Sequence, residues 1–517
     1  MNGAESLIRS LIAGGIEVCF ANPGTSEMHI VGALDVAEIR CVLGLFEGVV
    51  TGAADGYARM ADKPASTLLH LGPGFANGLA NLHNASRAHV PIVNIVGQHA
   101  TQHLKYDTPL TSDIEAIARP YSKWLRTSRA APEISRDAVE AIVAANTPPG
   151  QIATLIVPAD VAWSEISPGE TRSENIPAFP VAPMPDTKTI EQAAELLRSG
   201  LRTAVLLSDK SLYGKGLAAA GRVAAATNAK LLSPYPFTRM ERGGGAPAVE
   251  RMHYVPEQAT EQLKEFRQII LVASPVPASY FAYPGKNSLL APPECVLQTL
   301  ASPGEDCAGS LEALATALSL NERSSAAAKV DRAPSPSGEI SPQGLAAAVA
   351  ALLPENAIVV DESMTSGRGL MAATRNCRRH DWLANTGGSI GIAMPLAVGA
   401  AVACPDRRVL CFSADGSGMY TAQALWTMAR ERLKVTTIIF ANHAYAVLKR
   451  EFSGLDIGEP GPRASDLFDI GRPNLDWASL AKGMGVPGTR VTTLDAFVKA
   501  LREGFLSEGP ALIEVPL

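Results

Sequence analysis

Short apolar runs alternate with longer, Ala-rich segments along most of the chain. Residues 17–24 (EVCFANPG), 203–209 (TAVLLSD) and 357–363 (AIVVDES) are examples of such runs, and none shows the regular polar–apolar alternation of a half-exposed strand. Apolar strands that are separated by helices are typical of parallel sheets with helices on both sides. The pattern therefore predicts an α/β protein built from doubly wound parallel sheets.

Two segments interrupt this alternation and divide the chain. Residues 166–186 and 321–340 are rich in Pro, Ser and charged side chains and poor in periodic apolar positions, as expected of linkers. A chain of 517 residues is also too long for one core. We therefore expect three doubly wound parallel-sheet domains, at residues 1–165, 187–320 and 341–517.

The charge and cysteine content excludes several classes of protein. The chain carries 45 Lys and Arg against 51 Asp and Glu, a net charge of −6, without a long basic run, which argues against nucleic-acid binding. Its seven cysteines form no C-x-x-C pair, so neither a disulfide framework nor a zinc site is expected. The N-terminal segment has the spacing of an amphipathic helix rather than a signal peptide, and no apolar run is long enough to span a membrane. We expect a cytoplasmic protein.

Polar residues with the chemistry of a cation site stand at the ends of two predicted strands. Asp415 ends one strand, in the run 409–418 (VLCFSADGSG), and Asn442 ends the next. Ligands of such sheets bind beyond the carboxyl ends of the strands, and carboxylate, amide, backbone and phosphate oxygens form the shell that Mg²⁺ prefers. Each residue alone could equally be a helix cap or a turn residue. The pair favours a cation site.

A nicotinamide-binding protein is the obvious alternative, but its fingerprint is incomplete. Residues 416–421 (GSGMYT) lack the third glycine of the dinucleotide motif, and residues 214–221 (GKGLAAAG) match it only loosely. The second segment is better explained as a tight helix-packing turn or as the remnant of a nucleotide site.

Five segments carry further motifs: 21–27 (ANPGTSE), 46–59 (FEGVVTGAADGYAR), 72–85 (GPGFANGLANLHNA), 386–401 (TGGSIGIAMPLAVGAA) and 414–445 (ADGSGMY to ANHAY). In this order they resemble the thiamine-diphosphate-dependent decarboxylase and acetolactate synthase superfamily, and the resemblance covers essentially the whole chain. Ala414 replaces the first glycine of the family's cofactor motif, and Ala441 replaces one of its two final asparagines. The resemblance implies a pyrimidine-binding, a central and a diphosphate-binding domain, in the order of the three predicted pieces.

The resemblance also assigns contacts to the cofactor, thiamine diphosphate. Glu47 matches the glutamate that hydrogen-bonds the pyrimidine ring, and Gly388 matches the residue whose carbonyl receives the 4′-amino group. Ile390 matches the apolar side chain that keeps the cofactor bent. These three residues are the expected contacts to the organic rings of the cofactor.

The remaining assigned contacts concern Mg²⁺ and the diphosphate. Asp415 and Asn442 match the metal-binding side chains of the family, and Ala444 matches the residue that gives a backbone carbonyl to the metal. The expected diphosphate contacts are Thr365, Gly416 and Ser417. Tyr445 lies where a tyrosine that contacts the cofactor nearby is expected.

A proton-transfer site in the first domain is implied as well. His70 ends a predicted strand where aryl 2-oxo acid decarboxylases of this family carry a proton-shuttling histidine, and Thr25 lies where they have a pocket serine. We expect Glu47, His70 and Thr25 to be the catalytic residues. His99 and His103 flank the same region and are weaker candidates. Taken alone, His70 could equally be a structural hydrogen-bonding residue.

Smaller features bear on the reaction. The segment 278–285 (ASYFAYPG) offers Phe281 where benzoylformate decarboxylases use a second histidine, and 445–454 (YAVLKREFSG) places charged residues near the entrance. Both departures count against a dedicated aryl decarboxylase. We therefore expect an acetolactate synthase-like enzyme that decarboxylates a 2-oxo acid, pyruvate by default, and ligates the acyl fragment to an aldehyde or a second 2-oxo acid.

Alternatives within and beyond this class stay open. The first is a non-oxidative decarboxylase of the benzoylformate type; a 2-hydroxyacyl-CoA lyase and a non-catalytic paralogue are more distant. FAD is not expected, because residues 187–320 carry no convincing flavin motif. The family places its cofactor between subunits, so the resemblance implies a homodimer or homotetramer.

Overall fold

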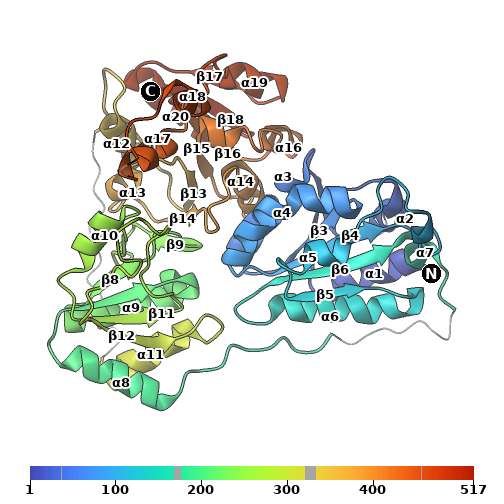
Figure 1. Ribbon diagram of the computed structural model, residues 1–517, viewed down its shortest axis with the longest axis horizontal. Helices are drawn as coiled ribbons and strands as arrows, with labels where there is room; N and C mark the ends of the chain where they lie inside the picture. The colour runs from blue at the N-terminus through green and yellow to red at the C-terminus, as the bar shows by residue number, and fades with distance from the viewer. Residues whose placement is uncertain (36–37, 168–175, 321–333, 456) are drawn as a thin grey trace.

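The computed structural model describes residues 1–35, 38–167, 176–320, 334–455 and 457–517. Three sheets of mostly parallel strands are each enclosed by helices, and they form three bodies that run from blue to cyan, green to yellow and orange to red in Figure 1. The predicted α/β class with three doubly wound sheets is therefore confirmed. The two predicted linkers, 166–186 and 321–340, lie partly outside the described residues.

The first sheet consists of β1 (Val18–Asn22), β2 (Arg40–Leu43), β3 (Ala65–Leu69), β4 (Ile92–Gln98), β5 (Trp124–Thr127) and β6 (Ile152–Pro158). Its helices are α1 (Gly3–Ala13), α2 (Met28–Leu34), α3 (Glu47–Ala61), α4 (Leu71–Arg87), α5 (Ile114–Ala118), α6 (Ile134–Asn146) and α7 (Ala159–Trp163), with 3₁₀ turns η1 (Thr25–Glu27), η2 (Leu104–Tyr106) and η3 (Ala131–Glu133). The strands are parallel, in the order β2-β1-β3-β4-β6-β5. Helices α3 and α4 cover one face, and α1 and α6 cover the other.

The second sheet consists of β7 (Thr203–Leu207), β8 (Lys230–Ser233), β10 (Glu250–Arg251), β11 (Gln268–Val272) and β12 (Val296–Ala301). Around it lie α8 (Thr187–Arg198), η4 (Asp209–Leu212), α9 (Gly214–Thr227), α10 (Pro256–Leu263) and α11 (Cys307–Ala317). Its strands are parallel, in the order β10-β8-β7-β11-β12.

The third sheet consists of β9 (Arg239–Arg242), β13 (Ala357–Glu362), β14 (His380–Ala384), β15 (Val409–Ala414), β16 (Val435–Ala441), β17 (Gly488–Arg490) and β18 (Ala511–Pro516). Its helices are α12 (Pro342–Leu352), α13 (Leu370–Ala373), α14 (Ala393–Ala403), α15 (Asp415–Gly418), α16 (Ala424–Arg430), α17 (Ala446–Gly454), α18 (Pro462–Leu467), α19 (Trp477–Gly483) and α20 (Leu494–Leu506). The order is β17-β18-β16-β15-β13-β14-β9, and β9 alone runs antiparallel to its neighbour. The sequence pattern did not predict that β9, from the expected central piece, would complete this sheet.

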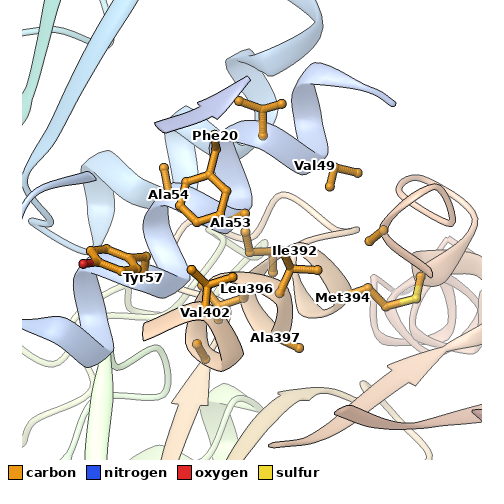
Figure 2. Close-up of a cluster of buried hydrophobic side chains, with 14 of the residues drawn as sticks. Phe20, Val49, Ala53, Ala54, Tyr57, Ile392, Met394, Leu396, Ala397 and Val402 are labelled. Atoms are coloured by element: carbon orange, nitrogen blue, oxygen red, sulfur yellow. The ribbon is translucent and has the colours of Figure 1, made fainter. Parts of the chain in front are cut away.

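Helices α3 and α14 join the first body to the third, and their backbones pack in direct contact. A Cβ added to Gly56 would lie 2.1 Å from the carbonyl oxygen of Leu396, and one added to Gly399 would lie 1.9 Å from that of Ala53. Glycine is required at both positions because any side chain would separate the helices. Figure 2 shows Tyr57 and its neighbours on α3 facing Leu396 and its neighbours on α14.

A buried ion pair lies at the same junction. The Arg59 guanidinium donates two hydrogen bonds to the Asp55 carboxylate, both 2.7 Å long, and both side chains are shielded from solvent. Arg59 also donates to the carbonyls of Ala384 and Thr238 and to the hydroxyl of Thr386. One cation therefore ties α3 to the ends of β14 and to the segment that leads into β9.

Candidate active site

Glu47 is the first residue of α3 and is only 7% exposed. Its Oε2 accepts a hydrogen bond of 3.0 Å from the Asn77 amide, whereas its Oε1 has no hydrogen-bond partner among the described residues. A Cβ added to Gly74 would lie 3.0 Å from Glu47 Oε1 and 3.2 Å from the Cβ of His70. Glu47 and His70 therefore flank the same glycine of α4, and one oxygen of the buried acid is available to a ligand.

His70 caps α4 and pairs with a buried acid that the sequence analysis did not single out. Its Nδ1 lies 2.8 Å from Oε2 of Glu27, and that oxygen also accepts the Gly24 backbone N–H at 2.7 Å. Burial raises the pKa of Glu27, and the Gly24 N–H and the His70 ring only partly offset this effect. Leu71, which follows His70, is buried with a φ of 50°, a strained conformation of the kind that clusters at functional sites.

A cavity of about 500 Å³ opens in front of His70. The predicted catalytic Thr25 and the weaker candidates His99 and His103 also line it, and the rings of these two histidines lie 5.5 Å apart. Burial, followed by the nearby His103 and His70, lowers the pKa of His99. The other lining residues are Ser26, Leu71, Ala100, Gln102, Lys105, Tyr106, Leu110, Ala159 and Trp163. Since none of them is an acid, the cavity suits an anionic substrate.

The two predicted metal-binding side chains lie together at the carboxyl ends of β15 and β16. Asp415 Oδ2 accepts the backbone N–H of His443 at 2.7 Å, next to Asn442, and Asp415 Oδ1 accepts that of Gly416. Asn442 Oδ1 accepts the backbone N–H of Ala444 at 3.1 Å. Burial raises the pKa of the Asp415 carboxyl group more than these N–H groups lower it.

The expected diphosphate contacts surround the same strand ends. A Cβ added to Gly416 would lie 2.6 Å from the ring of Tyr445, so the phenol packs directly on this glycine. Ser417 is buried two residues after Asp415, and Thr365 is half-buried and directly precedes Ser366. Ser366, which sequence reasoning missed, accepts a 3.3 Å hydrogen bond at its hydroxyl oxygen from the Asn442 side-chain amide.

Gly388 and Ile390 lie on the loop between β14 and α14. Gly388 has a φ of 79°, which favours glycine, and its N–H donates to the Asn385 side chain. A Cβ added to Gly388 would lie 2.1 Å from the hydroxyl of Tyr280. Phe281, the residue that the sequence suggested here, packs edge-on against Tyr280 and is 55% exposed. The central domain therefore presents Tyr280, not Phe281, to this loop.

The charged residues of α17 also face the central domain. Arg450 stacks over the ring of Tyr254 and pairs with Glu451, which accepts a hydrogen bond of 2.8 Å from Tyr283. Two of the predicted charged residues, Arg450 and Glu451, are therefore paired with each other and contact tyrosines of the central domain.

These residues fit thiamine diphosphate and Mg²⁺. Asp415, Asn442 and Ala444 supply only oxygen donors, the set that a hard cation requires. Ser417 and Thr365 carry hydroxyls, a suitable group for phosphate oxygens, and Oε1 of Glu47 has no hydrogen-bond partner among the described residues. The donor chemistry at the strand ends and the free oxygen of Glu47 agree with the two ends of such a cofactor.

Among the described residues, no helix is long and apolar enough to cross a membrane.

The fold and the site define a thiamine-diphosphate-dependent enzyme. Residues 1–117 match the N-terminal TPP-binding domain of thiamine pyrophosphate enzymes, and residues 366–515 match the C-terminal TPP-binding domain. The chain is 50% identical to the Mycobacterium tuberculosis protein named "Putative acetolactate synthase large subunit IlvX", over 100% of this chain and 99% of that protein. This chain therefore belongs to the thiamine pyrophosphate enzyme family.

Two further relatives carry decarboxylase names. Benzoylformate decarboxylase from Pseudomonas aeruginosa is 29% identical over 97% of this chain and 96% of its own length. The solved structure of the thiamine-diphosphate-dependent 4-hydroxybenzoylformate decarboxylase of Rhodococcus jostii RHA1 superposes with a TM-score of 0.87, at 26% identity, over 100% of this chain and 99% of that one. The acetolactate synthase and decarboxylase branches of the family are both represented among the relatives.

Proposed function

We propose that this enzyme decarboxylates a 2-oxo acid with thiamine diphosphate and Mg²⁺, and that protonation of the remaining fragment, with release of an aldehyde, is its principal outcome. The observation that supports this outcome is the pair of His70 and Glu27 at the mouth of the cavity. An imidazole fixed through one nitrogen by a buried acid can deliver a proton from the other.

The proposed roles divide between the two ends of the site. When bound, thiamine diphosphate supplies the electron sink that makes loss of CO₂ from a 2-oxo acid possible. Asp415, Asn442 and Ala444 would hold Mg²⁺, and Glu47 would hydrogen-bond the pyrimidine ring through its free Oε1. Gly388 would offer its backbone carbonyl to the same ring.

Proton transfer is the task of the first domain. His70 Nδ1 is engaged by Glu27, so Nε2 is the nitrogen that can give a proton to the reacting carbon and take one from solvent afterwards. Glu27 keeps the ring in one orientation and stabilises its protonated form while the proton is held. Thr25, on the same cavity wall, would hydrogen-bond the substrate carboxylate.

A panel of 2-oxo acids tests this proposal. Pyruvate, the default donor, and benzoylformate should be compared, because Tyr106, Trp163 and Leu110 give the cavity an apolar wall that suits an aryl group. Release of CO₂ and of aldehyde should be measured with added thiamine diphosphate and Mg²⁺. His70→Ala should lower aldehyde formation by about 10²–10⁴-fold. CO₂ release without aldehyde, or aldehyde formation unaffected by the substitution, would contradict the assigned outcome.

Carboligation is the second candidate. A cavity of about 500 Å³ is larger than pyruvate needs and leaves room for an acceptor aldehyde or 2-oxo acid. The same panel, repeated with acceptor aldehydes and analysed for 2-hydroxy ketones, separates the two fates.

The proposed active form is a homodimer or homotetramer. Leu45, which lies two residues before Glu47, and Met419 and Tyr420, which follow the Asp415 turn, are exposed apolar side chains next to the site. Exposed apolar side chains at a site favour its closure by a second subunit. Sedimentation of the enzyme with and without cofactor tests this, and a monomer that is fully active would contradict it.

A further inference from the structure

Glu362 is a buried carboxylate to which the proposed mechanism gives no role. It ends β13 and is only 3% exposed. Both of its oxygens accept the backbone N–H of Gly391 at 3.1 Å, Oε2 accepts that of Ala393 at 3.2 Å, and Oε1 accepts the Asn385 side-chain amide at 3.1 Å. One side chain therefore holds both ends of the loop between β14 and α14.

The middle of this loop is fixed by the same network. Asn385 donates to the carbonyl of Ser389 at 2.8 Å, and its oxygen accepts the N–H of Gly388 at 2.8 Å. From the first domain, Asn84 of α4 receives the N–H of Ser389 and donates to its carbonyl. Gly388 and Ile390 thus lie on a segment that is hydrogen-bonded from two sides. Asn84 holds it from the first domain, and Glu362 holds it from the third sheet.

The carboxylate has no cation beside it. Among the described residues, no Lys, Arg or His pairs with Glu362, and burial raises its pKa to about 7 even though the N–H groups act in the opposite direction. An uncompensated buried acid is costly unless its hydrogen bonds are needed. An apolar strand end is compatible with this sheet, because the two strands that pair with β13 end in Ala384 and Ala414.

We propose that Glu362 is a positioning residue: it holds residues 385–393 in the conformation that presents the Gly388 carbonyl and the Ile390 side chain to the cofactor. This inference rests on the proposed function, since it assigns these two residues to thiamine diphosphate. Glu362 does not touch the reacting atoms and acts only through the loop.

Glu362→Gln tests the proposal without a change in size. Both oxygens of Glu362 accept N–H groups, so the amide nitrogen of Gln must face a donor and at least one hydrogen bond is lost. Glu514→Gln is a matched control. Glu514 is also a buried acid of the third sheet, on β18, and accepts the N–H of Ala478, away from the loop. Glu362→Asp, which retains the charge but shortens the side chain, serves as a second variant.

Three measurements on the full-length protein separate positioning from a general loss of stability. In calorimetry with Mg²⁺, Glu362→Gln should weaken thiamine diphosphate binding by roughly tenfold or more, whereas Glu514→Gln should change it less than about twofold. Hydrogen exchange of residues 385–393 in the cofactor-free protein should be faster only in the Glu362 variants. At saturating cofactor, kcat should fall while the KM for the 2-oxo acid stays close to that of the wild type.

The outcomes distinguish this inference from the proposed function. If the wild-type protein binds thiamine diphosphate and Glu362→Gln binds it equally well, or if both variants weaken binding to the same extent, the positioning role is wrong. If the wild-type protein itself binds no thiamine diphosphate, the proposed function fails and the positioning role fails with it. If Glu362→Gln does not fold, the same criteria apply to Glu362→Asp: wild-type affinity for thiamine diphosphate and wild-type hydrogen exchange of residues 385–393 would show that the positioning role is wrong.

Discussion

Arg59→Met should destabilise the whole chain, because Arg59 lies where the three bodies meet. The substitution preserves the length of the side chain but removes the cation from the Asp55 carboxylate, whose pKa burial already raises. It also leaves the carbonyls of Ala384 and Thr238 without their donor. The buried Asp55 carboxylate and Ala384 carbonyl and the partly buried Thr238 carbonyl then lose a hydrogen bond, and such losses cause large single-site effects.

The size of the effect follows from this count of partners. Breaking a buried ion pair from one side costs about 3–5 kcal/mol. For unfolding of all 517 residues, an entropy of about 2.1 cal/mol/K per residue gives about 1.1 kcal/mol/K, so Tm should fall by roughly 3–5 °C. The exposed pair of Glu115 on α5 and Arg119, which directly follows this helix, provides a control, and Arg119→Met should change stability by less than about 1 kcal/mol.

Scanning calorimetry of the cofactor-free protein is the assay, and a double variant sharpens it. In Asp55→Leu/Arg59→Met the unpaired charge is gone, so Tm should rise again relative to Arg59→Met alone, although the two carbonyls stay unpaired. A Tm for Arg59→Met as close to the wild type as that of Arg119→Met would show that the buried ion pair does not stabilise the junction. So would a double variant that is no more stable than the single one.

Four shorter predictions concern the site. Glu47→Gln should lower CO₂ release by at least about a hundredfold, with an unchanged circular dichroism spectrum; retained turnover would contradict its role. Removal of Mg²⁺ with EDTA should abolish thiamine diphosphate binding in calorimetry, and added Mg²⁺ should restore it, because Asp415 and Asn442 offer only oxygen donors. Glu27→Gln should slow aldehyde formation by roughly tenfold or more with little change in KM. An unchanged rate would contradict the role of Glu27 in orienting His70. Because burial raises the pKa of Glu362 from an ordinary 4.5 to about 7, its contribution to stability is complete below pH 4.5 and is lost as pH rises through 7. The loss is about 3 kcal/mol, and it should be missing from the pH–Tm curve of Glu362→Gln.

The strand ends of the third sheet could be predicted from sequence because their signal is local. An apolar run that stops at Asp415 and another that stops at Asn442 are enough to place a carboxylate and an amide at one sheet edge. The same signal exists at Glu362, where the run AIVVDE ends in an acid. The role of Glu362 could not be predicted, because its main partners are backbone N–H groups of a loop. Every residue except proline has such a group, so the sequence does not reveal which ones Glu362 binds.

Glu27 and Tyr280 could not be assigned from sequence for a different reason. Glu27 lies 43 positions before His70, and the two meet only because β1 and β3 are parallel neighbours, with Asn22 opposite Leu69. Tyr280 lies in a loop of the central domain, and its contact with Gly388 depends on how two domains dock. Periodicity reports the faces of helices and strands but not the order of strands or the docking of domains.

Strand β9 was missed because its four residues, RMER, lack an apolar pattern. The pairing of Met240 with Trp382 of β14, rather than intrinsic propensity, makes this segment a strand.

The position of β9 also constrains the order in which the chain can be completed during synthesis. Residues 239–242 leave the ribosome well before residues 380–384, so this segment has no strand partner until the chain has been made at least to residue 384. A fragment that ends before residue 341 would leave the backbone N–H and C=O groups of residues 239–242 without their partners on β14, and such unpaired groups can recruit other chains. The central part of the chain is therefore not structurally self-contained: residues 239–242 become a strand only in a sheet whose other strands lie more than a hundred residues downstream.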